Sequence, residues 1–124
     1  MCIRNKKLLV VHKKNVGYIS LGGKINPGET DFQCLEREIK EEIGCTAKNP
    51  KLFATFEGST HDFKQTLRMV CYFCDIDGEI KLNPHDNVDG YLWIGKEDLP
   101  EIEKELAHML KANIIPALIE QGLL

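Results

Sequence analysis

A capped helix over residues 31–43 is the feature that most constrains what this chain can fold into. Thr30 is followed three residues later by Gln33, which matches a capping box, and Gly44 is a typical helix stop. Apolar residues recur between these signals at helical spacing, at Phe32, Leu35, Ile39 and Ile43. The sequence therefore predicts an amphipathic helix with one face buried against another element.

Short strand-like segments surround this helix and predict the fold class. They cover residues 8–12, 18–21, 52–56, 66–76, 79–82 and 90–94. Asp77-Gly78 predicts a hairpin turn before segment 79–82. Residues 101–124 predict a helix that Pro116 either breaks or restarts. Because the strands follow one another at hairpin distances, without strict β-α-β alternation, the order predicts an α+β fold.

Length, charge and hydropathy narrow the function classes. A chain of 124 residues with 43% hydrophobic and 28% charged residues predicts one globular domain, residues 1–124. The net charge of −3 lacks the basic footprint of nucleic-acid binding, so no nucleic-acid partner is expected. The longest early apolar run, residues 8–11, is far shorter than the roughly 20 residues of a membrane span. The first residues also lack the apolar core of a signal peptide, so we expect a cytoplasmic protein without a membrane partner.

The cysteines predict reduced thiols. There are five, at positions Cys2, Cys34, Cys45, Cys71 and Cys74. An odd count without a secretory signal favours free thiols. The spacing of Cys71 and Cys74 also fits a zinc or redox site. However, residues three apart on a strand face opposite sides, which favours two buried thiols.

Three glutamates of the predicted helix share one flank. Glu38, Glu41 and Glu42 fall within an arc of roughly 100° beside the apolar stripe, and Lys40 lies away from them. Like charges at this spacing destabilise a helix by a few tenths of a kcal/mol per pair. A divalent cation with oxygen ligands would turn that repulsion into coordination. The alternative is an ordinary solvated face.

A glycine-rich loop, residues 22–29, precedes the helix. Its glycines allow the backbone to approach a ligand closely and to turn sharply. Arg37 can hold a carboxylate with its planar fork, and Glu29 is one candidate partner. Loop and helix therefore form one candidate site.

Residues 23–45 resemble the Nudix box, G-x5-E-x7-R-E-U-x-E-E-x-G-U, where U is a bulky aliphatic residue. The matching positions are Gly23, Glu29, Arg37, Glu38, Ile39, Glu41, Glu42 and Gly44. Cys45 departs from the last position. The chain thus resembles the Nudix hydrolases (MutT-like), which implies a single Nudix domain built as an α/β/α sandwich around a mixed β-sheet.

This resemblance implies hydrolysis of a nucleoside diphosphate linked to another moiety, with Mg²⁺ as cofactor and Mn²⁺ as a substitute. The first expectation is a small-molecule nucleotide, a nucleoside triphosphate or a related compound. A nucleotide-sugar or dinucleoside-polyphosphate hydrolase is the alternative with the same chemistry. A non-catalytic, nucleotide-sensing Nudix domain is the alternative from another class.

The resemblance also assigns roles to residues. Glu38, Glu41 and Glu42 become metal ligands, together with a carbonyl of the Gly22–Gly23 pair. Glu38 or Glu41 is expected to activate water. Arg37 and Glu29 are expected to position the catalytic groups. A further acidic ligand is expected from the later loops, where the candidates are Glu57, Asp62, Asp86 and Asp89.

The expected substrate contacts are Tyr18, Lys24 and His61. Tyr18 stands where the family often has tryptophan and can stack on a base, or it is a core aromatic. His61 can contact phosphate, or it is a solvated loop residue. The family also has most of a strand before the position of Ile3, so the first strand is expected to be shortened. A shortened strand predicts an exposed neighbouring edge or pairing with another molecule, which includes a homodimer.

Overall fold

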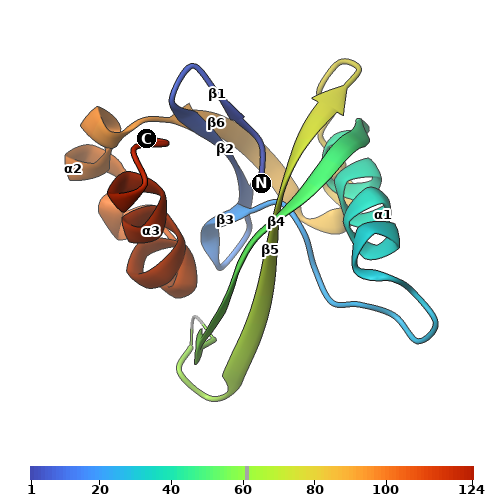
Figure 1. Cartoon of the computed structure of the whole chain (residues 1–124), viewed down its shortest axis with the longest axis horizontal. Helices are drawn as coiled ribbons and strands as arrows, with labels where there is room; N and C mark the ends of the chain where they lie inside the picture. Colours follow the sequence, from blue (N-terminus) through green and yellow to red (C-terminus); the bar gives the residue numbers. More distant parts are fainter. Residues whose placement is uncertain (61) are drawn as a thin grey trace.

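A computed structural model describes residues 1–60 and 62–124 and arranges them in three layers (Figure 1). Strands form the middle layer. Helix α1 (Asp31–Ile43) covers one side, and the C-terminal helices, which include α3 (Ile115–Glu120), cover the other. The predicted α+β class and the α/β/α layering are both confirmed.

Two sets of strands make the middle layer. In the first, β2 (Lys7–Lys13) pairs antiparallel with each of its neighbours, β1 (Ile3–Arg4), β3 (Gly17–Ser20) and β6 (Val88–Ile94). The second is the long hairpin of β4 (Thr46–Ser59) and β5 (Thr66–Asp77). This hairpin runs across the first sheet and beyond it (Figure 1).

Met1 joins the two sets. Its amino group donates to the carbonyl of Tyr72 at 2.6 Å, and its own carbonyl accepts from the N–H of Cys74 at 2.9 Å. Bonds to the residues on either side of Phe73 are the pattern of parallel pairing. The sheet is therefore mixed, because parallel pairing at Met1 meets antiparallel ladders elsewhere.

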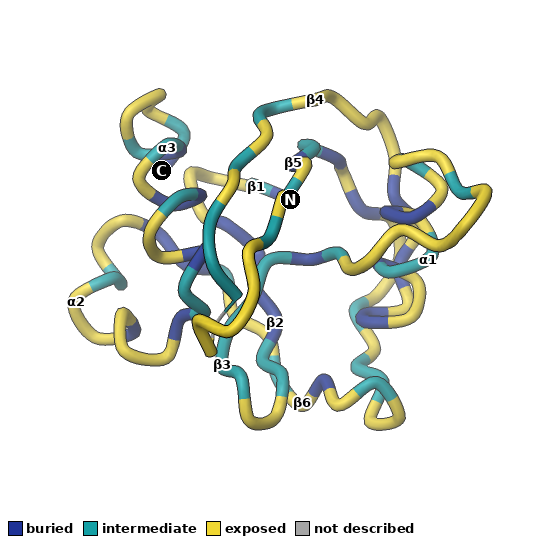
Figure 2. Tube along the Cα trace, turned by 90° about the horizontal axis from the view of Figure 1, so that it is seen from below, coloured by how far each residue is buried: buried dark blue, intermediate teal, exposed yellow. Residues whose placement is uncertain are grey.

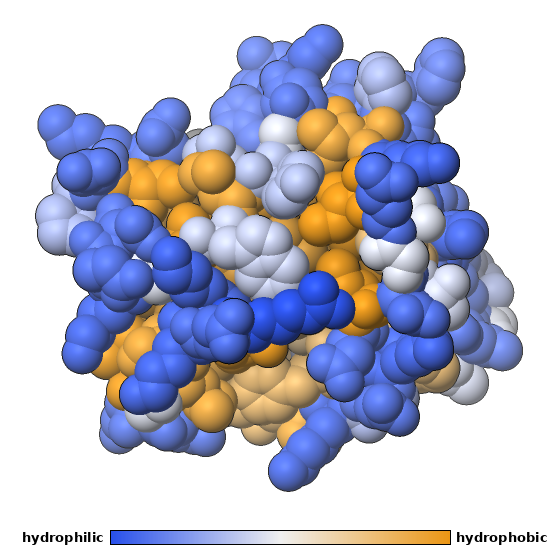
Figure 3. Space-filling view, turned by 90° about the horizontal axis from the view of Figure 1, so that it is seen from above, coloured by the Kyte–Doolittle hydropathy of each residue, from blue (hydrophilic) through white to orange (hydrophobic). Residues whose placement is uncertain are grey.

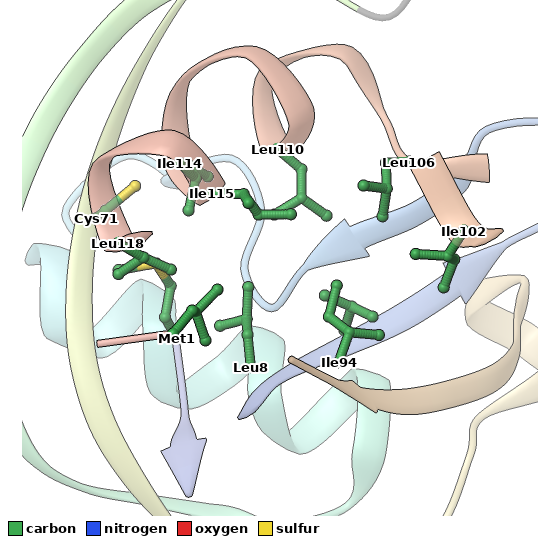
Figure 4. Close-up of a cluster of buried hydrophobic side chains, with 12 residues drawn as sticks. Met1, Leu8, Cys71, Ile94, Ile102, Leu106, Leu110, Ile114, Ile115 and Leu118 are labelled. Carbon is green, nitrogen blue, oxygen red and sulfur yellow. The ribbon is translucent and has the colours of Figure 1, made fainter. Parts of the chain in front are cut away.

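Strand β2 lies between two hydrophobic cores, and its residues alternate between them. Leu8 and Val10 belong to the core under the C-terminal helices, where Leu8 and Met1 face Leu110 and Leu118 (Figure 4). Leu9 and Val11 belong to the core under α1. Figure 2 shows β2 as buried, whereas much of the outer chain is exposed. A central strand with both faces buried explains the continuous apolar run at this point of the sequence.

The cysteines follow the same alternation. Cys71 packs in the core under the C-terminal helices and Cys74 in the core under α1. All five are free and buried, and burial raises the pKa of each thiol. The expectation that Cys71 and Cys74 are buried thiols is confirmed.

The C-terminal region departs from the single helix expected over residues 101–124. Helix α2 (Leu99–Ile102) ends early, and the backbone at Leu106 becomes extended. There Leu106 bridges to Tyr18, and the N–H of Ala107 donates to the Tyr18 carbonyl at 2.9 Å. The helix then resumes through a π-helical turn, Leu110–Ile114, and Pro116 lies in the first turn of α3. Residues 108–120 are helical without a break, so Pro116 neither ends nor starts a helix and lies directly after the π-helical turn.

The strand expected at residues 79–82 is wrong. Asp77 ends β5 opposite Thr46, and residues 79–82 form no ladder with β4 or β5. Lys81 instead donates its N–H to the carbonyl of Ile43 at 2.8 Å, at the end of α1. Strand β4 is longer than the segment expected at residues 52–56. Its first part escaped the sequence pattern because a bulge at Asn49, where φ is +53°, interrupts the alternation of the side chains.

The surface mixes polar and apolar side chains. The face seen in Figure 3 carries apolar patches between hydrophilic residues. Large apolar side chains that remain exposed include Leu52, Ile25 and Val70, at 58%, 52% and 38%. No helix in the described ranges is long and apolar enough for a bilayer crossing.

Candidate active site

Helix α1 begins and ends where its sequence signals place it. The Thr30 side chain accepts from the N–H of Gln33, and the Gln33 side chain accepts from the N–H of Thr30. Gly44 closes the helix in the left-handed conformation, with φ of +69°. These caps fix the rotation and length of the helix, and with them the positions of its glutamates.

Arg37 links the glycine-rich loop to the helix. Its guanidinium donates to both carboxylate oxygens of Glu29, at 2.8 and 3.1 Å, and to the carbonyl of Lys24 at 2.9 Å. A fourth bond, of 2.7 Å, reaches Oε1 of Glu38. The bonds from Arg37 hold the pKa of Glu29 below its usual range. Arg37 and Glu29 therefore hold the loop against the helix and orient the carboxylate of Glu38.

Gly23 packs directly against Glu38. A Cβ atom at position 23 would overlap the carboxyl group of Glu38, so any larger residue would displace that group. The glycine is needed here for close approach.

Glu42 is a buried carboxyl with one unused oxygen. Its side chain is 0% exposed. Oε1 accepts from the N–H of Gly22 at 3.0 Å, whereas Oε2 has no hydrogen-bond partner among the described residues. The nearest cation, Nζ of Lys13, is 4.0 Å from Oε2, too far for a hydrogen bond. Burial raises the pKa of Glu42 to about 8, because desolvation disfavours the charged form.

A second group of carboxylates lies at the exposed side of α1. Glu38, Glu41 and Asp86 each place one oxygen within 4.8 Å of the others. Oδ2 of Asp86 is buried, and no described group bonds to it. Asp86 ends the short turn Pro84–Asp86 that leads into β6. The structure thus brings a residue from a distant loop against the helix.

The other three acidic candidates lie elsewhere in the structure. Asp89 pairs with Nδ1 of His12 at 2.5 Å, and Asp62 accepts from the hydroxyl of Thr60 at 2.7 Å. Glu57 is on β4, opposite Arg68. Asp86 alone of the four joins the helix carboxylates.

These groups fit a hard divalent cation. The cluster offers carboxylate oxygens, the ligands that Mg²⁺ and Mn²⁺ prefer. The unpaired oxygens of Glu42 and Asp86 would be costly to bury unless a cation or a proton satisfied them.

A cleft of about 630 Å³ adjoins the glycine-rich loop. Its walls come from β3 and the loop that follows, from β5, and from the C-terminal segment beginning at Ala107. Gly22, Gly23 and Lys24 line it, so it reaches the loop that contacts Glu38 and Glu42.

The residues expected to contact the substrate do not all lie at the cleft. Lys24 lines the cleft. Tyr18 does not; its ring lies 5.0 Å from that of His12, and its backbone pairs with the C-terminal segment. That position gives no support to base stacking by Tyr18. His61 lies outside the described residues.

Comparison with known proteins identifies the family. The family model described as the NUDIX domain matches residues 1–118. The chain belongs to the Nudix family. A NUDIX hydrolase from Nitrosomonas europaea superposes with a TM-score of 0.79 at 18% identity, covering 98% of this chain and 84% of that one. The Nudix fold implied by the box is therefore confirmed.

Two curated Nudix relatives are a hydrolase and a diphosphatase by name. The NAD-capped RNA hydrolase NudC of Vibrio cholerae is 33% identical over 119 residues, covering 94% of this chain and 40% of that protein. The 8-oxo-dGTP diphosphatase of Haemophilus influenzae is 38% identical over 52 residues, covering 42% of this chain and 35% of that protein. The chain thus spans about two fifths of the length of these relatives, or less.

The raised pKa of Glu42 predicts how metal-free stability depends on pH. The unfolded carboxyl ionises near its ordinary pKa of 4.5, whereas the folded one stays protonated up to about 8. The folded state therefore binds one more proton in this window. The free energy of unfolding is expected to fall, by an amount on the order of a few kcal/mol, as pH rises from about 5 to 8. Urea denaturation in EDTA across this range measures it, and a flat or rising profile would contradict the assignment.

Proposed function

We propose that this Nudix domain is a divalent-metal-dependent hydrolase of nucleoside diphosphates linked to another moiety, with nucleoside triphosphates or related nucleotides as its first substrates. The observation that carries the proposal is the convergence of Glu38, Glu41 and Asp86 beside the glycine-rich loop. The adjoining cleft supports it, because a nucleotide in the cleft would extend its phosphates toward these carboxylates.

In this proposal four side chains hold the cation. The carboxylate oxygens come from Glu38, Glu41, Glu42 and Asp86, and a carbonyl oxygen comes from the Gly22–Gly23 pair. A bound Mg²⁺ or Mn²⁺ ion would neutralise phosphate charge and lower the pKa of bound water. Glu42 must release its proton to bind the cation.

The proton from the attacking water goes to Glu38. Its carboxylate is mostly buried, at 13% exposed, and the 2.7 Å bond from Arg37 fixes its orientation. Glu29 in turn holds Arg37 through two bonds. Glu41 is the second candidate for the base, because its carboxylate is more exposed, at 46%, and its bond to Arg37 is longer, at 3.3 Å.

A second candidate substrate is the NAD cap of RNA. The match to NudC along 94% of this chain favours it. The net charge of −3 favours a small nucleotide, because an acidic surface repels the RNA backbone. Both substrates would present the same pyrophosphate linkage to the carboxylates.

A nucleotide panel with Mg²⁺ tests the function. It contains nucleoside triphosphates including 8-oxo-dGTP, a nucleotide sugar, a dinucleoside polyphosphate and NAD-capped RNA, and it records release of phosphate, pyrophosphate or nicotinamide mononucleotide. We expect hydrolysis of a nucleoside triphosphate that stops in chelator. Millimolar Mg²⁺ is also expected to raise the melting temperature, since an ion at ten times its Kd adds about 1.4 kcal/mol.

Three results would redirect this proposal. Full hydrolysis in excess EDTA would show that the reaction does not require a metal ion. Nucleotide binding without turnover, under Mg²⁺ and Mn²⁺ alike, would support a nucleotide sensor. Turnover of capped RNA alone would establish the second candidate and contradict the expectation of no nucleic-acid partner.

A further inference from the structure

Phe63 exposes its ring at the tip of the β4–β5 hairpin. Its side chain is the most exposed of the large apolar ones among the described residues, at 67%. Its backbone lies in the left-handed region, with φ of +61°, which a bulky residue rarely adopts. The N–H of Phe63 donates to the carbonyl of Thr60 at 2.9 Å, and this bond holds the conformation. Residues kept in such a conformation cluster at functional sites.

The ring of Phe63 packs against the ring of His108. Their centroids are 4.5 Å apart, and the ring planes are inclined by 58°. His108 follows the break in the C-terminal helices, where the N–H of Ala107 donates to the carbonyl of Tyr18 at 2.9 Å. This bond to β3 fixes the segment that carries His108. Two segments far apart in the sequence thus form one aromatic pair, Phe63 and His108.

The aromatic pair lies at the end of the cleft that is remote from α1. His108 lines the cleft, and so do residues 67–72 of β5. At the usual rise per residue, that stretch of strand is about 17 Å long. Its last residue, Tyr72, donates its hydroxyl to Asp31 in the first turn of α1, at 2.9 Å. Its first residue lies toward the hairpin tip, which Figure 1 shows well away from α1.

The cleft is apolar around His108. Met109 and Leu110, which follow it in the chain, also line the cleft, and so does Leu67 at the start of β5. Gly58, which pairs with Leu67, packs against the side chain of Met109. A flat aromatic ligand suits this surface, because its face can stack on a ring while apolar side chains exclude water from its edges.

We propose that the aromatic pair is a stacking platform for the nucleobase, through which the domain selects substrates by the size of their aromatic ring system. This inference rests on the proposed function, because it takes the phosphates to lie at the glycine-rich loop and the carboxylates of α1. The rest of an extended nucleotide then follows β5 toward His108. The base stacks there on the exposed ring of Phe63.

Stacking determines which substrates are preferred. Every base has a π-face, so a stacking platform accepts all of them and distinguishes them chiefly by the area that it covers. ATP and GTP are therefore expected to have similar KM values, at least about threefold below those of CTP and UTP. The carboxylates act on the phosphates, so kcat is expected to vary less than KM.

Substitution of Phe63 tests the platform. Phe63→Ala removes the ring and is expected to raise KM for ATP at least about tenfold, with a much smaller change in kcat, because the phosphates keep their contacts. Phe63→Trp restores an aromatic ring and is expected to restore KM. Leu52→Ala is the matched control, because Leu52 is 58% exposed on the same hairpin and is not among the described residues that line the cleft. It is expected to behave as the natural protein does.

Two probes that resist hydrolysis separate the platform from the enzymatic function. ATP with methylene groups in place of both bridging oxygens carries the base, and methylene-bridged tripolyphosphate lacks it. In the presence of Mg²⁺, we expect the ring-proton NMR signals of His108 to move upfield with the first probe only. Phe63→Ala is expected to weaken binding of the first probe at least about tenfold and to leave binding of the second unchanged. The NMR signature needs no variant, so it remains decisive if Phe63→Ala does not fold.

The outcomes distinguish this inference from the proposed function. Unchanged binding of the base-carrying probe to Phe63→Ala, together with normal hydrolysis of nucleotides, would overturn the platform and leave the function intact. Weaker binding of both probes, not restored by Phe63→Trp, would overturn it in favour of a structural role for Phe63 in the hairpin. Base-dependent binding without turnover of any nucleotide would support the platform and contradict the proposed function.

Discussion

Replacing Glu38 with glutamine is expected to lower kcat on the best substrate at least about 100-fold. Glutamine keeps the size of the side chain but removes the charge. It therefore takes away both the base and one oxygen of the carboxylate cluster. The Arg37 guanidinium would still find an oxygen at this position, so the fold should remain intact. Steady-state rates at saturating Mg²⁺, with circular dichroism for folding, measure the effect.

Glu36→Gln is the matched control for this experiment. Glu36 lies on the same helix and is exposed, outside the carboxylate cluster. Exposed substitutions of this kind usually change stability by no more than about 0.5 kcal/mol. The control variant should therefore keep near-normal rates. Similar activity in both variants would show that Glu38 has no catalytic role.

Replacing Glu42 with glutamine is expected to change activity and metal-free stability in opposite directions. Activity should fall at least about 100-fold, and the Mg²⁺ concentration for half-maximal rate should rise, because the cation loses a carboxylate. Metal-free stability at pH 8 should increase by an amount on the order of a few kcal/mol, because an amide carries no charge to desolvate. The amide oxygen can still accept the bond from the N–H of Gly22.

Paired measurements separate these effects. Urea denaturation in EDTA at pH 6 and pH 8 gives the stability of both proteins, and Mg²⁺ titration of the rate gives the metal requirement. The fall in stability between these pH values should be present in the natural protein and absent from the variant. A variant that is less stable than the natural protein at both pH values would identify Glu42 as a packing residue.

The sequence was most informative where the determining interactions are local. The caps of α1 involve residues three or four apart, so Thr30, Gln33 and Gly44 predicted the bounds of the helix. The same periodicity placed Glu38, Glu41 and Glu42 on one flank. The contact between Arg37 and Glu29 followed from the proximity of loop and helix along the chain.

Interactions between distant segments were not predictable in the same way. Four acidic residues were candidates for a further ligand in the sequence. Only the path of the chain into β6 brings one of them, Asp86, next to the helix carboxylates. The break at Leu106 depends on a bridge to Tyr18, which no helical pattern encodes. The full burial of Glu42 was also not predictable from the sequence, because a glutamate on the flank of a helix usually reaches water.

The position of Asp86 opposite α1 has a consequence for how the protein loses its structure. The carboxylates that converge there come from segments far apart in the chain, and their like charges repel when no cation lies between them. An ion held by both segments would act as a removable cross-link that closes a long loop, as a disulfide does. The turn before β6 would then be the first part to separate from α1 on depletion of the ion. The cell's supply of divalent cations would thereby set the lifetime of the folded chain as well as its rate of turnover.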